Sequence, residues 1–180
     1  MEHSELNWFP QAWQWVRSAP DWGTVPQWAT VLIALCAFIA AIVSIRSQRE
    51  VARKRAATDF FLKTEMDTAL LQLHEKYLDA IDKLKMIETE KGEVSDSFAN
   101  TPDYWAIRNY LNLHELCAVG ILNGVFDEGV CYDFWSGELV LAHNNALPLI
   151  KYVQKLKNSQ NVYAEMEKIA KRWAPKRNVR

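Results

Sequence analysis

The sequence predicts an all-α protein in which an N-terminal transmembrane helix continues into a cytoplasmic helical bundle. The run from Trp28 to Ile45 has eighteen residues without charge, proline or glycine. At about 1.5 Å per residue, it nearly matches the roughly 30 Å hydrocarbon core of a bilayer. Downstream, apolar residues recur at helical spacing, and no alternation of period two is long enough for a strand. These two patterns indicate the fold class and a lipid bilayer as partner.

Residues 1–27 are expected to form an external, interfacial segment. They carry a net charge of −2, and five of the eight tryptophans fall within the first 28 residues. Tryptophan is enriched at the headgroup level of membranes. A Trp-lined external mouth of an assembly is the alternative interpretation. The tryptophans expected at the membrane surface are Trp13, Trp15, Trp22 and Trp28.

Residues 46–55 form a basic juxtamembrane stretch with a net charge of +4. Because basic residues accumulate on the cytoplasmic side of a span, the N-terminus is expected outside and the C-terminal domain inside, in a bacterial inner membrane. An acidic segment before the span argues against a secretory signal peptide. The cations expected to contact lipid phosphates are Arg46, Arg49, Arg53, Lys54 and Arg55.

Small side chains form a stripe along the predicted span, at spacings of 4, 3, 4 and 3 residues. Small residues allow helices to approach closely in lipid, where packing drives association. The stripe therefore predicts a homo-oligomer, although alanine is also common in single spans. Its members are Thr30, Ala34, Ala37, Ala41 and Ser44.

The span is expected to continue as a helix into the cytoplasm. No proline occurs between Pro26 and Pro102 and no glycine between Gly23 and Gly92, so one helix is allowed to run to about Lys91. A bend within 46–55 is the alternative. Within this stretch an amphipathic face is expected to pack against the bundle. It comprises Leu70, His74, Tyr77, Ile81 and Leu84, widened by Leu71, Leu78 and Ile87.

Residues 56–174 are assigned to the cytoplasmic bundle and 175–180 to a basic tail. A loop is expected at 92–101, followed by a helix that Thr101 caps and that Asn123-Gly124 ends. Further helices are predicted at about 127–143, 147–158 and 161–173, with Asn161 as a cap and Pro175 as a stop. Residues 56–170 carry a net charge of −8, which argues against a general nucleic-acid-binding surface.

One helix of the bundle concentrates polar residues. Arg108, Asn112 and Glu115 share a face, so they are expected to form a structural hydrogen-bonded network. His114 lies about 120° away, among apolar residues, and is expected in the core. No cofactor or metal site is predicted: the three cysteines are widely spaced, and Asp127, Glu128 and Asp133 lie near a helix start, where acids favour the helix dipole.

Arg108-Asn109 followed by four residues and His114 resembles the Arg-polar-x-His signature of the HEPN superfamily. Many of these helical proteins are metal-independent ribonucleases. The resemblance implies a catalytic pair, Arg108 and His114, with nucleic acid as a partner only under this alternative. No second catalytic group occurs at helical spacing, which favours a protein that is not an enzyme.

A wider resemblance covers most of residues 28–173. The sequence is similar to an uncharacterised bacterial family of membrane-anchored helical proteins with a domain of unknown function. It also resembles, more distantly, the HEPN-like membrane accessory proteins of type VI CRISPR systems. The motifs are Arg55-Ala-Ala-Thr58, Tyr110-Leu-Asn112-Leu-His-Glu115, Gly124-x-x-Asp127-Glu128 and Tyr163-x-x-Met-x-x-Ile169-x-x-x-Trp173.

Three functions follow as hypotheses. The first is a self-associating inner-membrane protein, in its sharpest form a pore-forming or membrane-perturbing accessory in antiviral defence. The second is a membrane-tethered HEPN-type ribonuclease. The third is a membrane scaffold that recruits a cytoplasmic protein partner.

Overall fold

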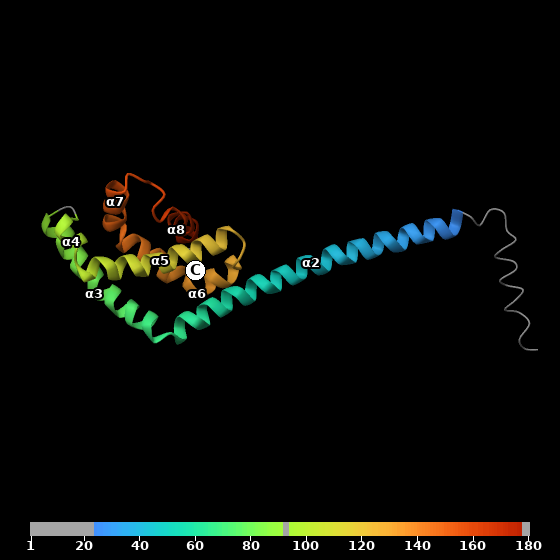
Figure 1. Ribbon diagram of the computed structural model, residues 1–180, viewed down its shortest axis with the longest axis horizontal. Coiled ribbons are helices and arrows are strands. Elements are labelled where there is room, and N and C mark those ends of the chain that lie inside the picture. Colours follow the sequence, from blue (N-terminus) through green and yellow to red (C-terminus); the bar gives the residue numbers. More distant parts are fainter. Residues whose placement is uncertain (1–23, 92–93, 178–180) are drawn as a thin grey trace, which may run out of the picture. The chain divides into compact units, whose positions relative to one another are not determined.

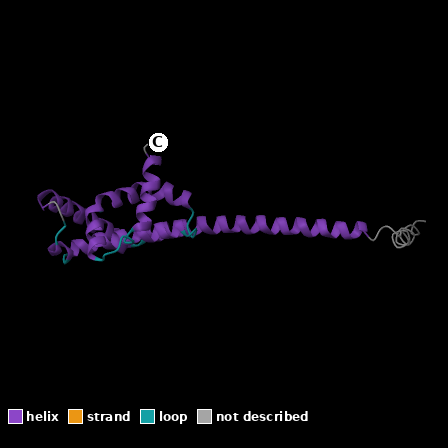
Figure 2. Ribbon diagram, turned by 90° about the horizontal axis from the view of Figure 1, so that it is seen from above, coloured by secondary structure: helices purple, strands orange, loops and turns teal. Residues whose placement is uncertain are grey.

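All seven helices lie within the residues that the structure describes, 24–91 and 94–177, and this part of the chain contains no strand (Figures 1 and 2). The structure is a computed structural model. The prediction of an all-α fold is confirmed. Trp13, Trp15 and Trp22 lie outside the described residues. The helices are α2 (Thr24–Met66), α3 (Thr68–Lys91), α4 (Asp96–Ala99), α5 (Pro102–Leu122), α6 (Glu128–Asn145), α7 (Leu147–Leu156) and α8 (Ala164–Arg177).

The first part of α2 is long and apolar enough to cross a membrane. An 18-residue window in this helix has a mean hydropathy of 2.5, and none of that window is buried in the chain. Its large apolar side chains from Trp28 to Ile45 are 36% to 70% exposed. The chain divides into two compact units after Arg49, inside the basic stretch.

The chain bends at Asp67, so neither expectation for the long helix was correct. α2 is continuous through residues 46–55 and ends at Met66. The Asp67 N–H makes a last bond to the Lys63 carbonyl at 3.1 Å, and the Asp67 Oδ1 accepts the Ala69 N–H at 2.8 Å. An aspartate in this position satisfies a free N–H at the start of the next helix. The Asp67 side chain thus caps α3 directly after the end of α2, without glycine or proline.

α3 packs on α5 (Figure 1), and the central part of the amphipathic face predicted for α3 is buried. Tyr77, Ile81 and Leu84 are at most 2% exposed. The expected loop before α5 contains the short helix α4, whose Phe98 is buried. α5 begins as predicted, because the Thr101 hydroxyl accepts the Tyr104 N–H at 3.3 Å.

The last three helices close the bundle. The Asp127 Oδ1 accepts the Val130 N–H at 3.1 Å and caps α6. α7 ends in a Schellman motif: Asn158 has a φ of 47°, and the Ser159 N–H bonds to the Gln154 carbonyl at 3.0 Å. α8 contacts both α5 and α6. It starts at Ala164, later than expected from a cap at Asn161, and continues past Pro175 to Arg177.

The core of the bundle is formed by α3, α5, α6, α7, α8 and the C-terminal part of α2. Phe61 of α2 stacks on Phe134 of α6, with ring centroids 4.8 Å apart. Gly120 of α5 is required by a close approach, because a Cβ at this position would overlap the ring of Phe126. The largest completely buried side chain is Trp173 of α8. This core fixes the helices that carry the polar groups of the candidate site.

Candidate functional site

A chain of hydrogen bonds links α3, α5 and α6 through the hydroxyl of Tyr110. This hydroxyl donates to the Glu138 Oε1 at 3.0 Å, and the His74 Nδ1 lies 2.8 Å from the same oxygen. A carboxylate accepts only, so the single phenolic proton is directed to Glu138. His74 must therefore donate through Nδ1–H, which leaves its Nε2 as an acceptor while the ring is neutral.

Tyr110 is held in place by aromatic packing. Its ring stacks on Tyr77 with centroids 4.1 Å apart and an interplanar angle of 23°. Burial, together with the negative charge of Glu138, raises the pKa of Tyr110. Its hydroxyl therefore keeps its proton at neutral pH and acts as a fixed donor between the two helices.

Exposed apolar side chains flank both ends of this chain. Leu71 and Leu78 lie three residues before and four after His74, and they are 47% and 49% exposed. Phe134 and Leu141 lie four residues before and three after Glu138, and they are 57% and 52% exposed. Residues at these spacings share one helix face. We call these four residues, with His74 and Glu138, the α3/α6 face.

The expectation that Leu71 and Leu78 widen the packed face of α3 was wrong. α5 covers the narrower stripe through Tyr77, Ala80, Ile81 and Leu84 and leaves the flanking leucines in solvent. Exposed apolar side chains next to polar groups that can hydrogen-bond are found at protein–protein contact sites. This arrangement is suited to binding another protein surface. It combines exposed apolar side chains with one carboxylate and one imidazole that can form hydrogen bonds.

Arg108 contacts aromatic residues instead of acids. Its Nε donates to the Tyr163 hydroxyl at 3.2 Å and its Nη1 to the Tyr104 hydroxyl at 3.3 Å. The guanidinium carbon lies 5.7 Å from the ring centroids of both Tyr104 and Trp105, a cation–π distance. The Tyr163 hydroxyl also donates to the Asn112 Oδ1 at 3.2 Å. Arg108 and Asn112 are thus joined through Tyr163.

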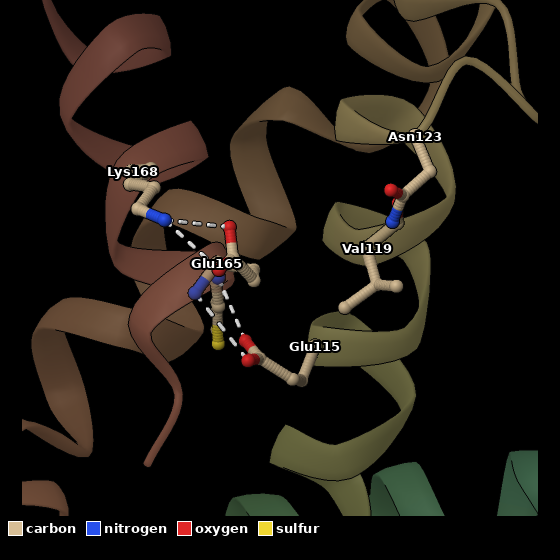
Figure 3. A network of polar contacts seen from close by, with 6 residues as sticks. Glu115, Val119, Asn123, Glu165 and Lys168 are labelled. Atoms are coloured by element: carbon tan, nitrogen blue, oxygen red, sulfur yellow. Dashed lines mark hydrogen bonds and ion pairs between the residues drawn. The ribbon is translucent and has the colours of Figure 1, made fainter. Parts of the chain in front are cut away.

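Glu115 has a separate role at the start of α8. Its Oε2 accepts the Met166 N–H at 2.7 Å and its Oε1 accepts the Glu165 N–H at 3.3 Å (Figure 3). Burial raises the pKa of Glu115, although both N–H groups oppose the shift. The structure therefore brings all three polar residues of α5 to the segment 163–166, with different partners.

His114 is completely buried and lies apart from the Arg108 contacts. Its ring stacks on Trp135 with centroids 4.5 Å apart, and its Nδ1 donates to the Tyr110 carbonyl at 3.0 Å. Burial lowers the pKa of His114 to about 4. A neutral imidazole without access to solvent cannot exchange a proton with a bound RNA, so the geometry disfavours the ribonuclease hypothesis.

The remaining predicted site residues are exposed or capping. The stripe Thr30, Ala34, Ala37, Ala41 and Ser44 is exposed along α2, as are Trp28 and the basic residues Arg46, Arg49, Arg53, Lys54 and Arg55. Lys54 forms an ion pair with Glu50 at 2.6 Å. Glu128 accepts from Arg172 at 2.9 Å and from the Trp173 indole at 3.2 Å, which fixes α8 to α6.

The fold defines an all-α protein with one candidate membrane span and a helical bundle. The sequence pattern described as Domain of unknown function (DUF4760) matches residues 31–173, and the chain belongs to this family. No curated protein and no solved structure matches the chain. None of these findings supports the resemblance to HEPN proteins or to CRISPR accessory proteins.

Sequence reasoning placed His74 on the packed face of α3 and missed Glu138. The sequence did not indicate that His74 and Glu138 belong together, because they are 64 positions apart and are connected through the Tyr110 hydroxyl. A histidine among the leucines of an amphipathic face was the one local indication that a polar partner lies opposite.

Proposed function

We propose that this protein is a membrane-anchored, non-enzymatic assembly protein that associates with copies of itself through its span and the α3/α6 face. The observation that carries the proposal is the composition of this face. Its apolar side chains remain about half exposed, and they flank a fixed hydrogen-bond chain that positions an imidazole and a carboxylate.

A second copy is the occupant that this composition favours. In a two-fold symmetric dimer the same patch meets itself, so a face must carry both halves of each contact. The α3/α6 face does so for its apolar contacts, because Leu71, Leu78, Phe134 and Leu141 supply apolar area to both sides. A direct bond between His74 of one protomer and Glu138 of its partner requires the protonated imidazole, because the Nε2 of the neutral ring and the carboxylate both accept.

The proposal assigns the uncovered part of α2 to the bilayer. Its large apolar side chains are exposed within the described chain, which supports lipid or another copy as their surroundings. The positive charge of residues 46–55 supports an inner-membrane orientation with the N-terminus outside. The stripe from Thr30 to Ser44 supports close packing between spans.

A pore-forming or membrane-perturbing role in antiviral defence is the sharper form of this proposal. A single span without charged side chains does not conduct ions alone, so such a role requires a ring of several copies. A dimer instead supports the scaffold role, in which the paired bundles recruit a cytoplasmic partner. The number of copies therefore separates the two forms.

The test measures the mass of the full chain in detergent by light scattering. Leu71→Glu with Leu141→Glu places acids on the α3/α6 face, and Ala37→Leu with Ala41→Leu separates packed spans. Leu116→Glu and Ile39→Leu are matched controls, because Leu116 is 57% exposed on α5 and Ile39 lies off the stripe. We expect the wild type and both controls to share an oligomeric mass and both test variants to lose mass.

Circular dichroism and the melting temperature must show that the variants remain folded. A monomeric wild type would overturn self-association altogether. If the face variants keep the wild-type mass while the span variants do not, the α3/α6 face is not the interface.

A further inference from the structure

A groove lies where α3, α4, α6 and α7 meet. Its volume is about 920 Å³, which is within the range of small-molecule sites. Lys85, Lys151 and Lys155 line it, together with Tyr152 and the amides of Asn144 and Asn145. Leu147 and Pro148 add apolar surface.

The groove gathers positive charge in an acidic bundle. Residues 56–170 contain ten lysines and arginines against eighteen acids. Three of those ten cations line this groove. Two lysines elsewhere in the bundle are paired with acids: Lys83 contacts Asp103 at 2.8 Å, and Lys168 contacts Glu165 at 2.9 Å. In the described part of the chain, neither Lys151 nor Lys155 has a carboxylate within 4.0 Å.

The acids in the groove do not neutralise these lysines. Among the lining residues that the structure describes, Glu88 and Asp96 are acidic, against the three lysines. Asp96 is engaged by the Tyr152 hydroxyl, which donates to its Oδ1 at 2.7 Å. This bond ties α4 to α7 and holds one wall of the groove. The Lys85 Nζ lies 3.8 Å from the Asp82 Oδ1 in a solvent-exposed ion pair. Because exposed ion pairs are weak, this contact does not prevent the Lys85 ammonium from binding a ligand.

We propose that this groove binds a small phosphate-bearing molecule. Lys151 and Lys155 are one helical turn apart on α7, and Lys85 approaches from α3, so the three ammonium groups bind phosphate oxygens as separate point charges. The amides of Asn144 and Asn145 bind the polar part of the ligand, and Leu147 with Pro148 contacts its apolar part. A free phosphorylated metabolite and a phospholipid headgroup share this chemistry.

The test uses the full chain and two probes. Inorganic pyrophosphate, titrated calorimetrically into protein in a zwitterionic detergent, stands for a free ligand. Nanodiscs of phosphatidylcholine with or without phosphatidic acid stand for a lipid source, with the melting temperature as readout. Lys151→Gln with Lys155→Gln removes two of the groove cations. Lys76→Gln with Lys157→Gln removes the same charge from exposed positions on α3 and after α7 that do not line the groove.

We expect saturable binding of pyrophosphate, stabilisation by phosphatidic acid, or both, and at least a tenfold loss of affinity or complete loss of stabilisation in the groove variant. The control variant should bind like the wild type. Pyrophosphate binding assigns a free ligand, and a response only to phosphatidic acid assigns a lipid headgroup. Absence of both responses, or equal loss in the two variants, overturns the proposal. Neither readout depends on self-association, since ligand affinity is compared between variants of the same measured mass.

Discussion

Two histidines contact Tyr110, and their surroundings differ. His74 bonds to the Tyr110 hydroxyl and is partly exposed, whereas His114 bonds to the Tyr110 carbonyl and is completely buried. The Nε2 of His114 has no hydrogen-bond partner among the described residues. A buried imidazole with one unpaired nitrogen is stable only in its neutral form, because a buried charge without a partner costs a large desolvation energy. His74 therefore belongs to a surface, and His114 belongs to the core.

His114 should make the protein sensitive to acid. Its pKa is lowered from 6.5 to about 4 by burial, so the unfolded chain binds this proton more readily than the folded chain. The stabilising contribution is complete above about pH 6.5 and is lost as the pH falls toward 4. The expected loss over this window is about 3 kcal/mol. Denaturant unfolding in detergent, followed by near-ultraviolet circular dichroism at several pH values, measures it.

His114→Leu is the matching variant, because it keeps most of the side-chain volume and removes the titration. The difference in unfolding free energy between wild type and variant should shrink or reverse as the pH falls from 6.5 to 4. Parallel pH dependences of the two proteins would show that His114 is not the acid-sensitive group. His114→Ala should be less stable than His114→Leu at neutral pH, since it leaves a cavity beside Trp135.

At the scale of elements, helix ends decide how α8 joins the bundle. Tyr163, with a φ of 60°, turns the chain into α8 and bonds to residues of α5. Glu115 then binds two N–H groups in the first turn, a role that an N-cap side chain would otherwise fill. The start of α8 is thus determined by a carboxylate from another helix.

Glu115→Ala should destabilise the bundle by about 1 to 3 kcal/mol, because the Glu165 and Met166 N–H groups lose a charged acceptor. Glu115→Gln should lose less, since it retains one carbonyl oxygen. Glu167→Ala is the control: Glu167 lies in the same turn but pairs with Lys171 at the surface, where ion pairs contribute little. Melting temperatures compare the three, and equal losses for Glu115→Ala and Glu167→Ala would contradict the capping role.

At the scale of the whole molecule, opposed charge blocks surround one apolar helix. The segment before the span carries a net charge of −2 and the stretch after it +4. Every large apolar side chain from Trp28 to Ile45 is exposed within the chain. Under the proposed function a bilayer removes this surface from water, and the lysine and arginines of residues 46–55 select the direction of insertion.

Cysteine labelling in whole cells should give opposite results at the two ends of the chain. We expect Ser4→Cys to react with a membrane-impermeant reagent and Gln160→Cys, beside Ser159, to be protected until the cells are permeabilised. Cys36→Ala provides the background, because Cys36 is exposed in the chain while Cys117 and Cys131 are buried. The reverse labelling pattern would place the bundle outside the cytoplasm.

Local physics allowed several features to be predicted from the sequence. The uncharged run of α2, the cap at Thr101, the acid at Asp127 and the turn at Asn123-Gly124 depend on residues within a few positions of one another. Their effects on helix starts, helix ends and hydropathy are the same in almost any fold. The all-α fold and the candidate span therefore follow from the sequence alone.

Only the tertiary structure decided which side chains are covered and which groups meet. The His74–Tyr110 bond spans 36 residues and the Glu115–Met166 bond spans 51. Such partners depend on how each helix is rotated against its neighbours, and helical spacing restricts a residue to a face without saying what covers it. For this reason Leu71 and Leu78 were expected to be packed and are exposed. For the same reason Arg108 and Glu115 share a face of α5 but bind different parts of the segment before and within α8.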